Sequence, residues 1–134
     1  MSFENKEARS HFLIFAYTSL DHPIEECYRD KVLSDIKNGK AEKGLEEKFT
    51  TALVGCSFLS KEKGKIDKAT VDEWFLKKHN KISSCKAYEG TVIGLNGEGA
   101  TVQTPQGQKI YKTKLKPNLK VGDSVKVHGD YVIE

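Results

Sequence analysis

The chain has 134 residues, of which 37% are hydrophobic and 31% are charged, and its formal net charge at pH 7 is +3. This composition is typical of a soluble globular protein, and the small positive charge falls short of the basic surface of a dedicated nucleic-acid-binding protein. No apolar run approaches the roughly 20 residues that cross a bilayer, and the polar start MSFENKEARS does not resemble a secretory signal. We therefore expect a cytoplasmic protein with no membrane partner.

The N-terminal part has apolar residues at helical spacing, which predicts a run of about four helices. Phe12 and Phe15 share one face of a first helix. The sequence DHP at residues 21–23 should end that helix, because the residue before a proline disfavours helical geometry. A second helix follows the proline and ends near the Asn-Gly pair at residues 38–39, which is typical of a helix C-terminus.

A third helix is predicted over residues 41–59, where apolar residues recur at helical spacing opposite charged ones. Its apolar face comprises Leu45, Phe49, Ala52, Leu53, Cys56 and Leu59. A fourth helix has Asp67 or Thr70 as its N-cap and ends near residues 79–80. It carries Trp74 and Phe75, which we expect to be buried against the C-terminal part.

The sequence after Cys85 is rich in Gly, Val and Thr and nearly alternates between apolar and polar residues, which predicts strands. Five antiparallel strands are expected over residues 86–95, 100–104, 109–114, 124–128 and 131–133, separated by Gly-containing turns. A sheet this small can bury its apolar face only by closing into a barrel. The sequence therefore predicts an α+β fold with a helical segment packed on a small OB-like or SH3-like β-barrel.

The two parts are expected to form a helical domain over residues 1–82 and a barrel domain over residues 83–134. Domains of this size are only marginally stable alone. We therefore predict that they pack together, share their stability and have no long linker between them.

The barrel sequence resembles a known family at both of its ends. It begins CKAYEGTVI at Cys85, which is similar to the start MCLAIPGKVV of the hydrogenase-maturation chaperones of the HypC/HupF family. It ends VGDSVKVHGDYVIE, which is similar to that family's VGDYVLVHAGFAIE after a one-residue gap. The resemblance covers roughly residues 84–134 and does not reach the helical part.

This resemblance implies an accessory protein, or chaperone, that binds a protein partner and transiently carries iron with cyanide and carbon monoxide ligands. In the family, the iron-holding cysteine follows the initiator methionine. Here Cys85 follows a helical segment, so its amino group lies in a peptide bond and only its thiol, a soft donor suited to iron, remains as a ligand. Glu89 replaces the family's proline, and the family's C-terminal helix has no counterpart up to Glu134. We expect no enzymatic activity, because no nucleophile or phosphate-binding motif occurs.

Cys85 and His128 are the candidate metal-binding residues, and we expect them to lie together at the mouth of the barrel. The polar neighbours of Cys85 favour an exposed thiol with an accessible thiolate, and the alternative is a structural cysteine. His128 is either a ligand or partner contact, or a hydrogen-bonded surface histidine. The predicted partner-binding surface comprises Cys85, Lys86, Ala87, Tyr88, Gly90 and His128.

The remaining cysteines are interpreted as packing residues. Three cysteines cannot all pair within one chain, and they form no C-x-x-C motif, which argues against a disulfide framework or a zinc knuckle. Cys56 lies on the apolar face of the third predicted helix. His22 and Cys27 do not match a usual metal-ligand spacing, so we interpret them as a helix start and a core position.

A nucleic-acid-binding module is the competing hypothesis. Small barrels bind single strands by combining aromatic platforms with a basic groove. The candidate residues around the third strand are Lys109, Tyr111, Lys112 and Lys114, with Lys116 and Lys120 beyond it. Lysines at this place are also typical of an edge strand that is protected against pairing with another chain. A purely structural adaptor is a third possibility.

Overall fold

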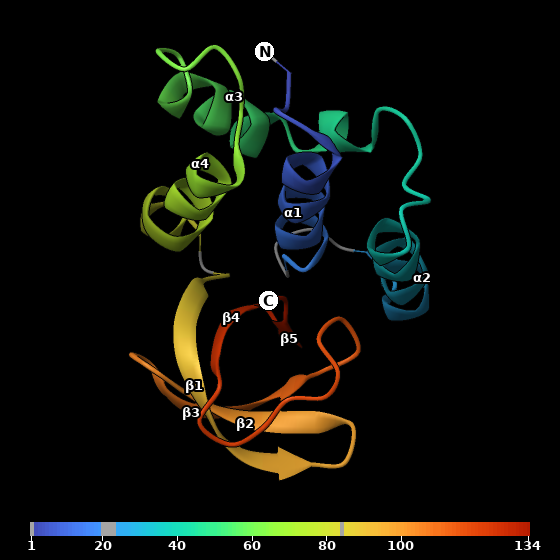
Figure 1. Cartoon of the computed structure of the whole chain (residues 1–134), viewed down its shortest axis with the longest axis vertical. Helices are drawn as coiled ribbons and strands as arrows, with labels where there is room; N and C mark the ends of the chain where they lie inside the picture. Colours follow the sequence, from blue (N-terminus) through green and yellow to red (C-terminus); the bar gives the residue numbers. More distant parts are fainter. Residues whose placement is uncertain (1, 20–23, 84) are drawn as a thin grey trace.

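A computed structural model describes residues 2–19, 24–83 and 85–134, and it places the helices at one end of the molecule and the barrel at the other (Figure 1). The helical part comprises α1 (Lys6–Tyr17), α2 (Glu26–Lys37), a 3-10 turn (Leu45–Lys48), α3 (Thr50–Leu59), α4 (Lys68–Glu73), a π turn (Trp74–Lys78) and a second 3-10 turn (His79–Lys81). The barrel comprises β1 (Ala87–Asn96), β2 (Gly99–Thr104), β3 (Gly107–Lys112), β4 (Ser124–His128) and β5 (Tyr131–Val132). None of the described helices has the length and apolar character needed to cross a membrane.

Local side-chain chemistry explains where several helices begin and end. The Asn5 side chain accepts a hydrogen bond from the Ala8 amide and so caps α1. Asp67, rather than Thr70, is the N-cap of α4, since its carboxylate accepts the Thr70 amide at 2.8 Å. The second helix ends before Gly39, which has a φ of +73°, as the sequence predicts. The proposed helix stop at residues 21–23 lies outside the described residues, and α1 ends at Tyr17.

The third predicted helix is too long by its first nine residues. Gly44 adopts a left-handed φ of +84°, and a 3-10 turn follows, so α3 begins only at Thr50. Of the predicted apolar face, Phe49 and Cys56 are buried, whereas Leu45, Ala52, Leu53 and Leu59 are half-buried. The helical spacing of the apolar residues was real, but it continued across a break that only the backbone conformation reveals.

The barrel is closed, with the strand order β1-β2-β3-β5-β4, and it confirms the predicted α+β architecture. The expectation that all five strands are antiparallel is wrong at one position, because β3 and β5 pair in parallel through Lys112 and Tyr131. The cause is geometric: directions cannot alternate all the way around a closed ring with an odd number of strands. The parallel pair therefore closes the barrel.

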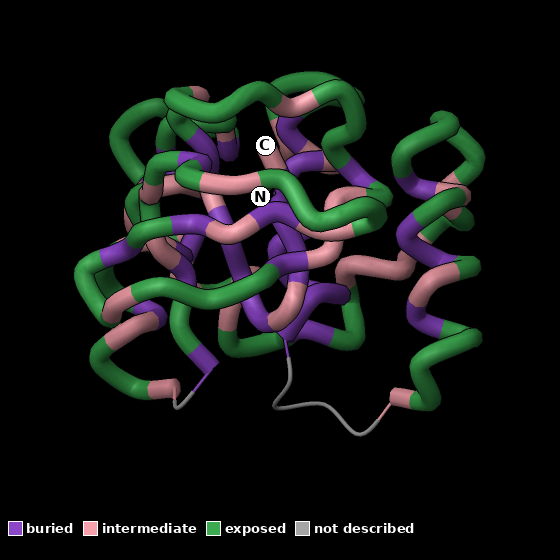
Figure 2. The backbone as a smooth tube through the Cα atoms, turned by 90° about the horizontal axis from the view of Figure 1, so that it is seen from below, coloured by how far each residue is buried: buried purple, intermediate pink, exposed green. Residues whose placement is uncertain are grey.

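Two apolar cores lie along the molecule, and the buried segments gather toward its interior (Figure 2). The barrel core consists of Val92, Ala100, Val102, Tyr111, Val125, Val127 and Val132. The second core belongs mainly to the helices, but it also contains Ala87, Leu115, Tyr131 and Ile133 from the barrel part. The helices and the barrel thus share one buried cluster, so the two parts pack together as predicted.

The prediction for Trp74 and Phe75 holds for Phe75 only. The Phe75 ring is buried and lies 5.8 Å, between centroids, from the ring of His128 in β4. Trp74 is half-buried and instead covers Gly55 of α3 so closely that an added Cβ would lie 2.4 Å from its indole. The two residues diverge because adjacent positions on a helical turn point in different directions.

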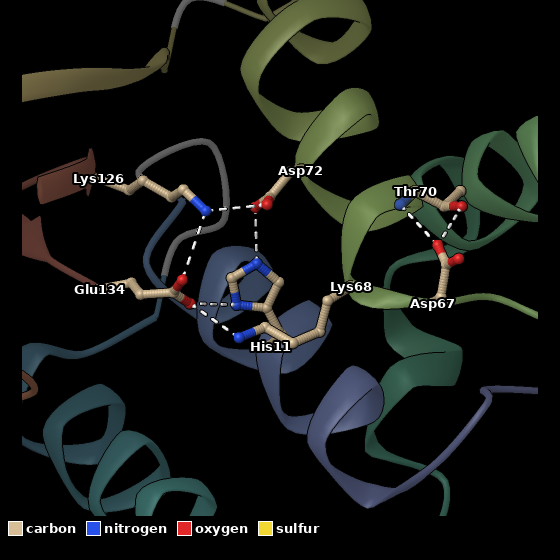
Figure 3. Close-up of polar contacts among 7 residues, drawn as sticks. All are labelled: His11, Asp67, Lys68, Thr70, Asp72, Lys126 and Glu134. Atoms are coloured by element: carbon tan, nitrogen blue, oxygen red, sulfur yellow. Dashed lines mark hydrogen bonds and ion pairs between the residues drawn. The ribbon is translucent and has the colours of Figure 1, made fainter.

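A polar cluster also joins the helices to the barrel (Figure 3). The two ring nitrogens of His11 in α1 lie 2.7 Å from Asp72 in α4 and 3.1 Å from Glu134, and Lys126 of β4 contacts both carboxylates. Burial would raise the pKa of Asp72, but hydrogen bonds from His11 and Lys126 outweigh it and hold that pKa below its usual range. The cluster fixes the position of α1 and α4 over the barrel mouth.

Candidate functional site

The structure brings together the two residues that the sequence singles out as metal donors. Cys85 Sγ lies 3.5 Å from His128 Nε2, although the residues are 43 positions apart. The strand register explains the contact: Ala87 of β1 is paired with His128 of β4, and Cys85 lies just before β1. A barrel that pairs its first and fourth strands in this register places the thiol beside the imidazole.

The orientation of the His128 ring is fixed by α1. Its Nδ1 lies 2.6 Å from the carbonyl oxygen of Phe15 and 3.0 Å from the hydroxyl oxygen of Thr18. A carbonyl oxygen can only accept, so Nδ1 carries a proton and donates it. Nε2 of the neutral ring then has a lone pair directed at Cys85, and the thiol can donate to it. Metal-binding histidines are commonly oriented by this kind of contact on the other ring nitrogen.

The predicted exposure of this site is wrong. Cys85 is 6% exposed and His128 is 0% exposed, and the adjacent Ala87 is also fully buried. The reason is that the C-terminal turn of α1 and the ring of Phe75 cover the barrel mouth. The sequence of the barrel alone does not indicate this cover. Its α1 part lies more than 50 residues before Cys85 in the chain.

Half of the predicted partner-binding residues are consequently not on the surface, namely Cys85, Ala87 and His128. Lys86 is exposed, and its ammonium group donates to the carbonyl oxygens of Asn80 and Ser83. Tyr88 is half-buried and lines a groove of about 610 Å³ between α4 and β1. Gly90 is also half-buried, and a Cβ there would lie 2.6 Å from the Gln103 carbonyl oxygen. Of the predicted partner residues, Lys86 is therefore exposed, and Tyr88 and Gly90 remain partly accessible.

Of the other two cysteines, which were both predicted to be packing residues, one is buried and one is exposed. Cys56 is buried, as expected, and burial raises the pKa of its thiol to about 12. The interpretation of Cys27 as a core position is wrong, because this residue is exposed and its thiol contacts Glu25 at the start of α2. The buried face of α2 consists of Arg29, Val32, Leu33 and Ile36. His22 lies outside the described residues.

Alkylation should therefore modify Cys27 first in the native protein, with Cys85 and Cys56 following slowly. Exposure controls access to the thiol, and the raised pKa of Cys56 leaves little thiolate at neutral pH. A time course with iodoacetamide, read by peptide mass spectrometry, measures the order. Protein unfolded in urea is the control and should lose most of the difference. Modification of Cys85 as fast as Cys27 would contradict the burial of the pair.

Sequence reasoning missed His79, which completes the wall around the pair. His79 is 8% exposed, and its ring meets the ring of His128 edge to face at 5.2 Å between centroids. It also lines a cavity of about 330 Å³ with Ser83, whose hydroxyl accepts the amide of Cys85 at 3.1 Å. The available signal was a histidine at the end of the fourth predicted helix, six residues before the candidate cysteine.

Asn80 is a second residue that the sequence did not single out. Its side-chain amide donates to the Ala87 carbonyl oxygen at 2.6 Å and accepts from the Ala87 amide at 2.9 Å. This two-way contact imitates the pairing between neighbouring strands, and it fastens the end of the helices to the start of β1. Lys86 adds to this attachment, since its ammonium group donates to the carbonyl oxygens of Asn80 and Ser83.

In the observed conformation, this site offers a metal two side-chain donors, Cys85 and His128. Within residues 2–19, 24–83 and 85–134, no three His, Cys, Asp or Glu side chains lie close enough to hold a metal ion. In a tetrahedral site, bond lengths of about 2.3 Å to sulfur and about 2.0 Å to nitrogen place the two ligand atoms about 3.5 Å apart. Cys85 and His128 already have this separation, so they fit two ligands of one metal.

The residues proposed for nucleic-acid binding are mostly engaged within the protein. Tyr111 is 6% exposed in the barrel core, so its role as an exposed stacking platform is wrong. The three candidate lysines each face a carboxylate: Lys109 contacts Asp130, Lys112 contacts Glu26 and Lys114 contacts Asp30. These pairs lower the net positive charge of the surface. Lys116 and Lys120 are exposed.

Comparison with known proteins gives no family assignment. No protein-family model matches the chain, and no curated protein matches it. Functional interpretation therefore rests on the barrel-sequence resemblance and on the geometry around Cys85 and His128.

Proposed function

We propose that this chain is a cytoplasmic accessory protein that binds a protein partner and transiently holds iron through Cys85 and His128 during maturation of a hydrogenase-type metalloenzyme. The observation that carries the proposal is the 3.5 Å separation between Cys85 Sγ and His128 Nε2. The two donors occupy positions at which the sequence resembles the HypC/HupF chaperones, and the pairing of β1 with β4 brings them together.

The donor chemistry supports iron as cargo rather than as a permanent cofactor. A thiolate and an imidazole are suitable ligands for iron, and the thiolate is the softer donor. In a tetrahedral site, two protein donors leave two coordination positions to small ligands or to a partner. A site that supplies only part of the coordination sphere can release its metal to a partner that supplies the rest.

The burial of the pair supports a role for the partner in opening the site. Cys85 and His128 are both buried, and Phe15, Thr18 and Phe75 contact the His128 ring, so an incoming metal complex needs this cover to move. Lys86 and Tyr88 lie beside this cover on the accessible surface. A partner that docks on the groove at Tyr88 contacts α4, the π turn and β1, and β1 begins two residues after Cys85.

Replacing Cys85 by serine should abolish iron retention while leaving the fold intact. The serine hydroxyl can still donate to His128, so the change leaves no unsatisfied buried group. The test is anaerobic loading with ferrous iron, removal of excess metal and iron analysis of the protein, followed by capture of partners with the loaded protein. Cys27→Ser is the matched control and should retain iron, because Cys27 is exposed and remote in sequence from the site.

Equal iron content in Cys85→Ser and the unmodified protein would contradict the proposal. A tight, steeply salt-dependent affinity for single-stranded RNA in a protein that retains no iron would favour the nucleic-acid hypothesis instead. The ion pairs of Lys109, Lys112 and Lys114 lead us to expect weak RNA binding.

A further inference from the structure

We propose that His79 is a third metal donor of this site and that metal reaches the Cys85–His128 pair through the cavity that His79 lines. This inference rests on the proposed function and extends it to a residue that the barrel resemblance does not include. The candidate donor set is then one thiolate and two imidazoles, with at least one position left for a small ligand or for a partner side chain.

The first support is the position of His79 between the cavity and the pair. One side of the residue faces the cavity of about 330 Å³, which Ser83 also lines. On the other side, the ring meets His128 at 5.2 Å and an angle of 85°. A metal complex that enters the cavity therefore encounters His79 before it reaches His128 and Cys85.

The second support is the room available for the ring to move. In the observed conformation the three side chains are too far apart to share a metal. The cavity borders His79, so the imidazole has open space beside its ring contacts with Phe75 and His128. His79 follows a π turn, Trp74–Lys78, and such turns occur frequently at functional sites.

The third support is that the site lacks a nitrogen ligand that a free amino group at Cys85 would supply. The amino group of Cys85 lies in a peptide bond and donates to Ser83, so it cannot supply a ligand. An imidazole from the preceding helical turn replaces that missing nitrogen. Histidine is the nitrogen donor that first-row metals most commonly use in proteins, and the ring of His79 contacts the ring of His128.

Cobalt(II) is a suitable probe, because its visible absorption reports the number and type of its ligands. We expect the unmodified protein to bind cobalt with a thiolate-to-metal absorption band. His79→Phe keeps an aromatic ring against Phe75 and His128 but removes the donor. It should weaken cobalt binding by about tenfold or more, a loss that is seen even when a residue that only orients a metal ligand is changed. His79→Cys restores a donor and should recover binding. Thermal unfolding of each variant checks its fold.

Four outcomes decide between the possibilities. Loss in His79→Phe with recovery in His79→Cys supports the inference. Unchanged affinity and spectrum in His79→Phe overturn it, and the proposed function survives if Cys85→Ser still loses metal. Failure of the unmodified protein to bind either cobalt or ferrous iron overturns both. Should His79→Phe not fold, His79→Gln provides the same comparison, and an unchanged affinity there overturns the inference.

Discussion

A fragment of residues 82–134, which contains the barrel alone, should lose cooperative thermal unfolding and become poorly soluble. In the intact chain, Ala87, Leu115, Tyr131 and Ile133 belong to the apolar core shared with the helices. Removing the helices exposes these side chains to water. It also removes the Phe15 carbonyl oxygen, which accepts the hydrogen bond from His128 Nδ1, and the Thr18 hydroxyl next to it. The remaining barrel core consists mainly of valines and is too small to compensate.

Circular dichroism during heating and a two-dimensional amide NMR spectrum measure this outcome directly. We expect a broad, non-sigmoidal melt and poorly dispersed amide signals from the fragment. The intact protein is the reference, and addition of a separate fragment of residues 1–81 is a control that should restore at least part of the signal dispersion. A sharp melt with well-dispersed signals from the barrel alone would show that the two parts are independent domains.

The strands were predictable because their chemistry is local. Alternating apolar residues and Gly-containing turns give each strand its length, and the closed barrel follows from the small size of the sheet. The proximity of Cys85 to His128 was also predictable, since it follows from pairing between the first and fourth strands. The parallel β3–β5 pair was missed, although an odd number of strands in a closed ring requires one.

The burial of Cys85 and His128 was not predictable from the barrel sequence alone. The polar residues around Cys85 indicate exposure when they are considered by themselves, but Cys85 is buried beside His128, whose ring is covered by α1 and the π turn. Likewise, the lysines of β3 look like a basic patch until α2 places Glu26 and Asp30 beside Lys112 and Lys114. In both cases the deciding contact joins segments that are far apart in the chain, and no local pattern encodes it.

Phe75→Ala should lower the free energy of unfolding by about 3 to 5 kcal/mol. This loss should exceed that of an alanine substitution at Trp74, the other aromatic residue of the π turn. The Phe75 ring is fully enclosed, stacks on Phe15 at 4.7 Å and contacts Phe12, His79 and His128. Truncation leaves a cavity between rigid rings that cannot easily collapse. Because small domains are stable by only about 5 to 15 kcal/mol, this loss is a large part of the total.

Phe58→Ala is the matched control, since Phe58 also lies on a helix but is 75% exposed, and it should change the free energy of unfolding by less than about 0.5 kcal/mol. Urea unfolding measures both variants. The same pair tests the cover over the functional site: Phe75→Ala removes a ring that packs against His128, so alkylation of Cys85 should become faster, whereas Phe58→Ala should leave its rate unchanged. Equal destabilisation by the two substitutions would contradict the central position of Phe75. A lower free energy of unfolding in Phe75→Ala without faster alkylation of Cys85 would instead show that the Phe75 ring does not restrict access to the thiol.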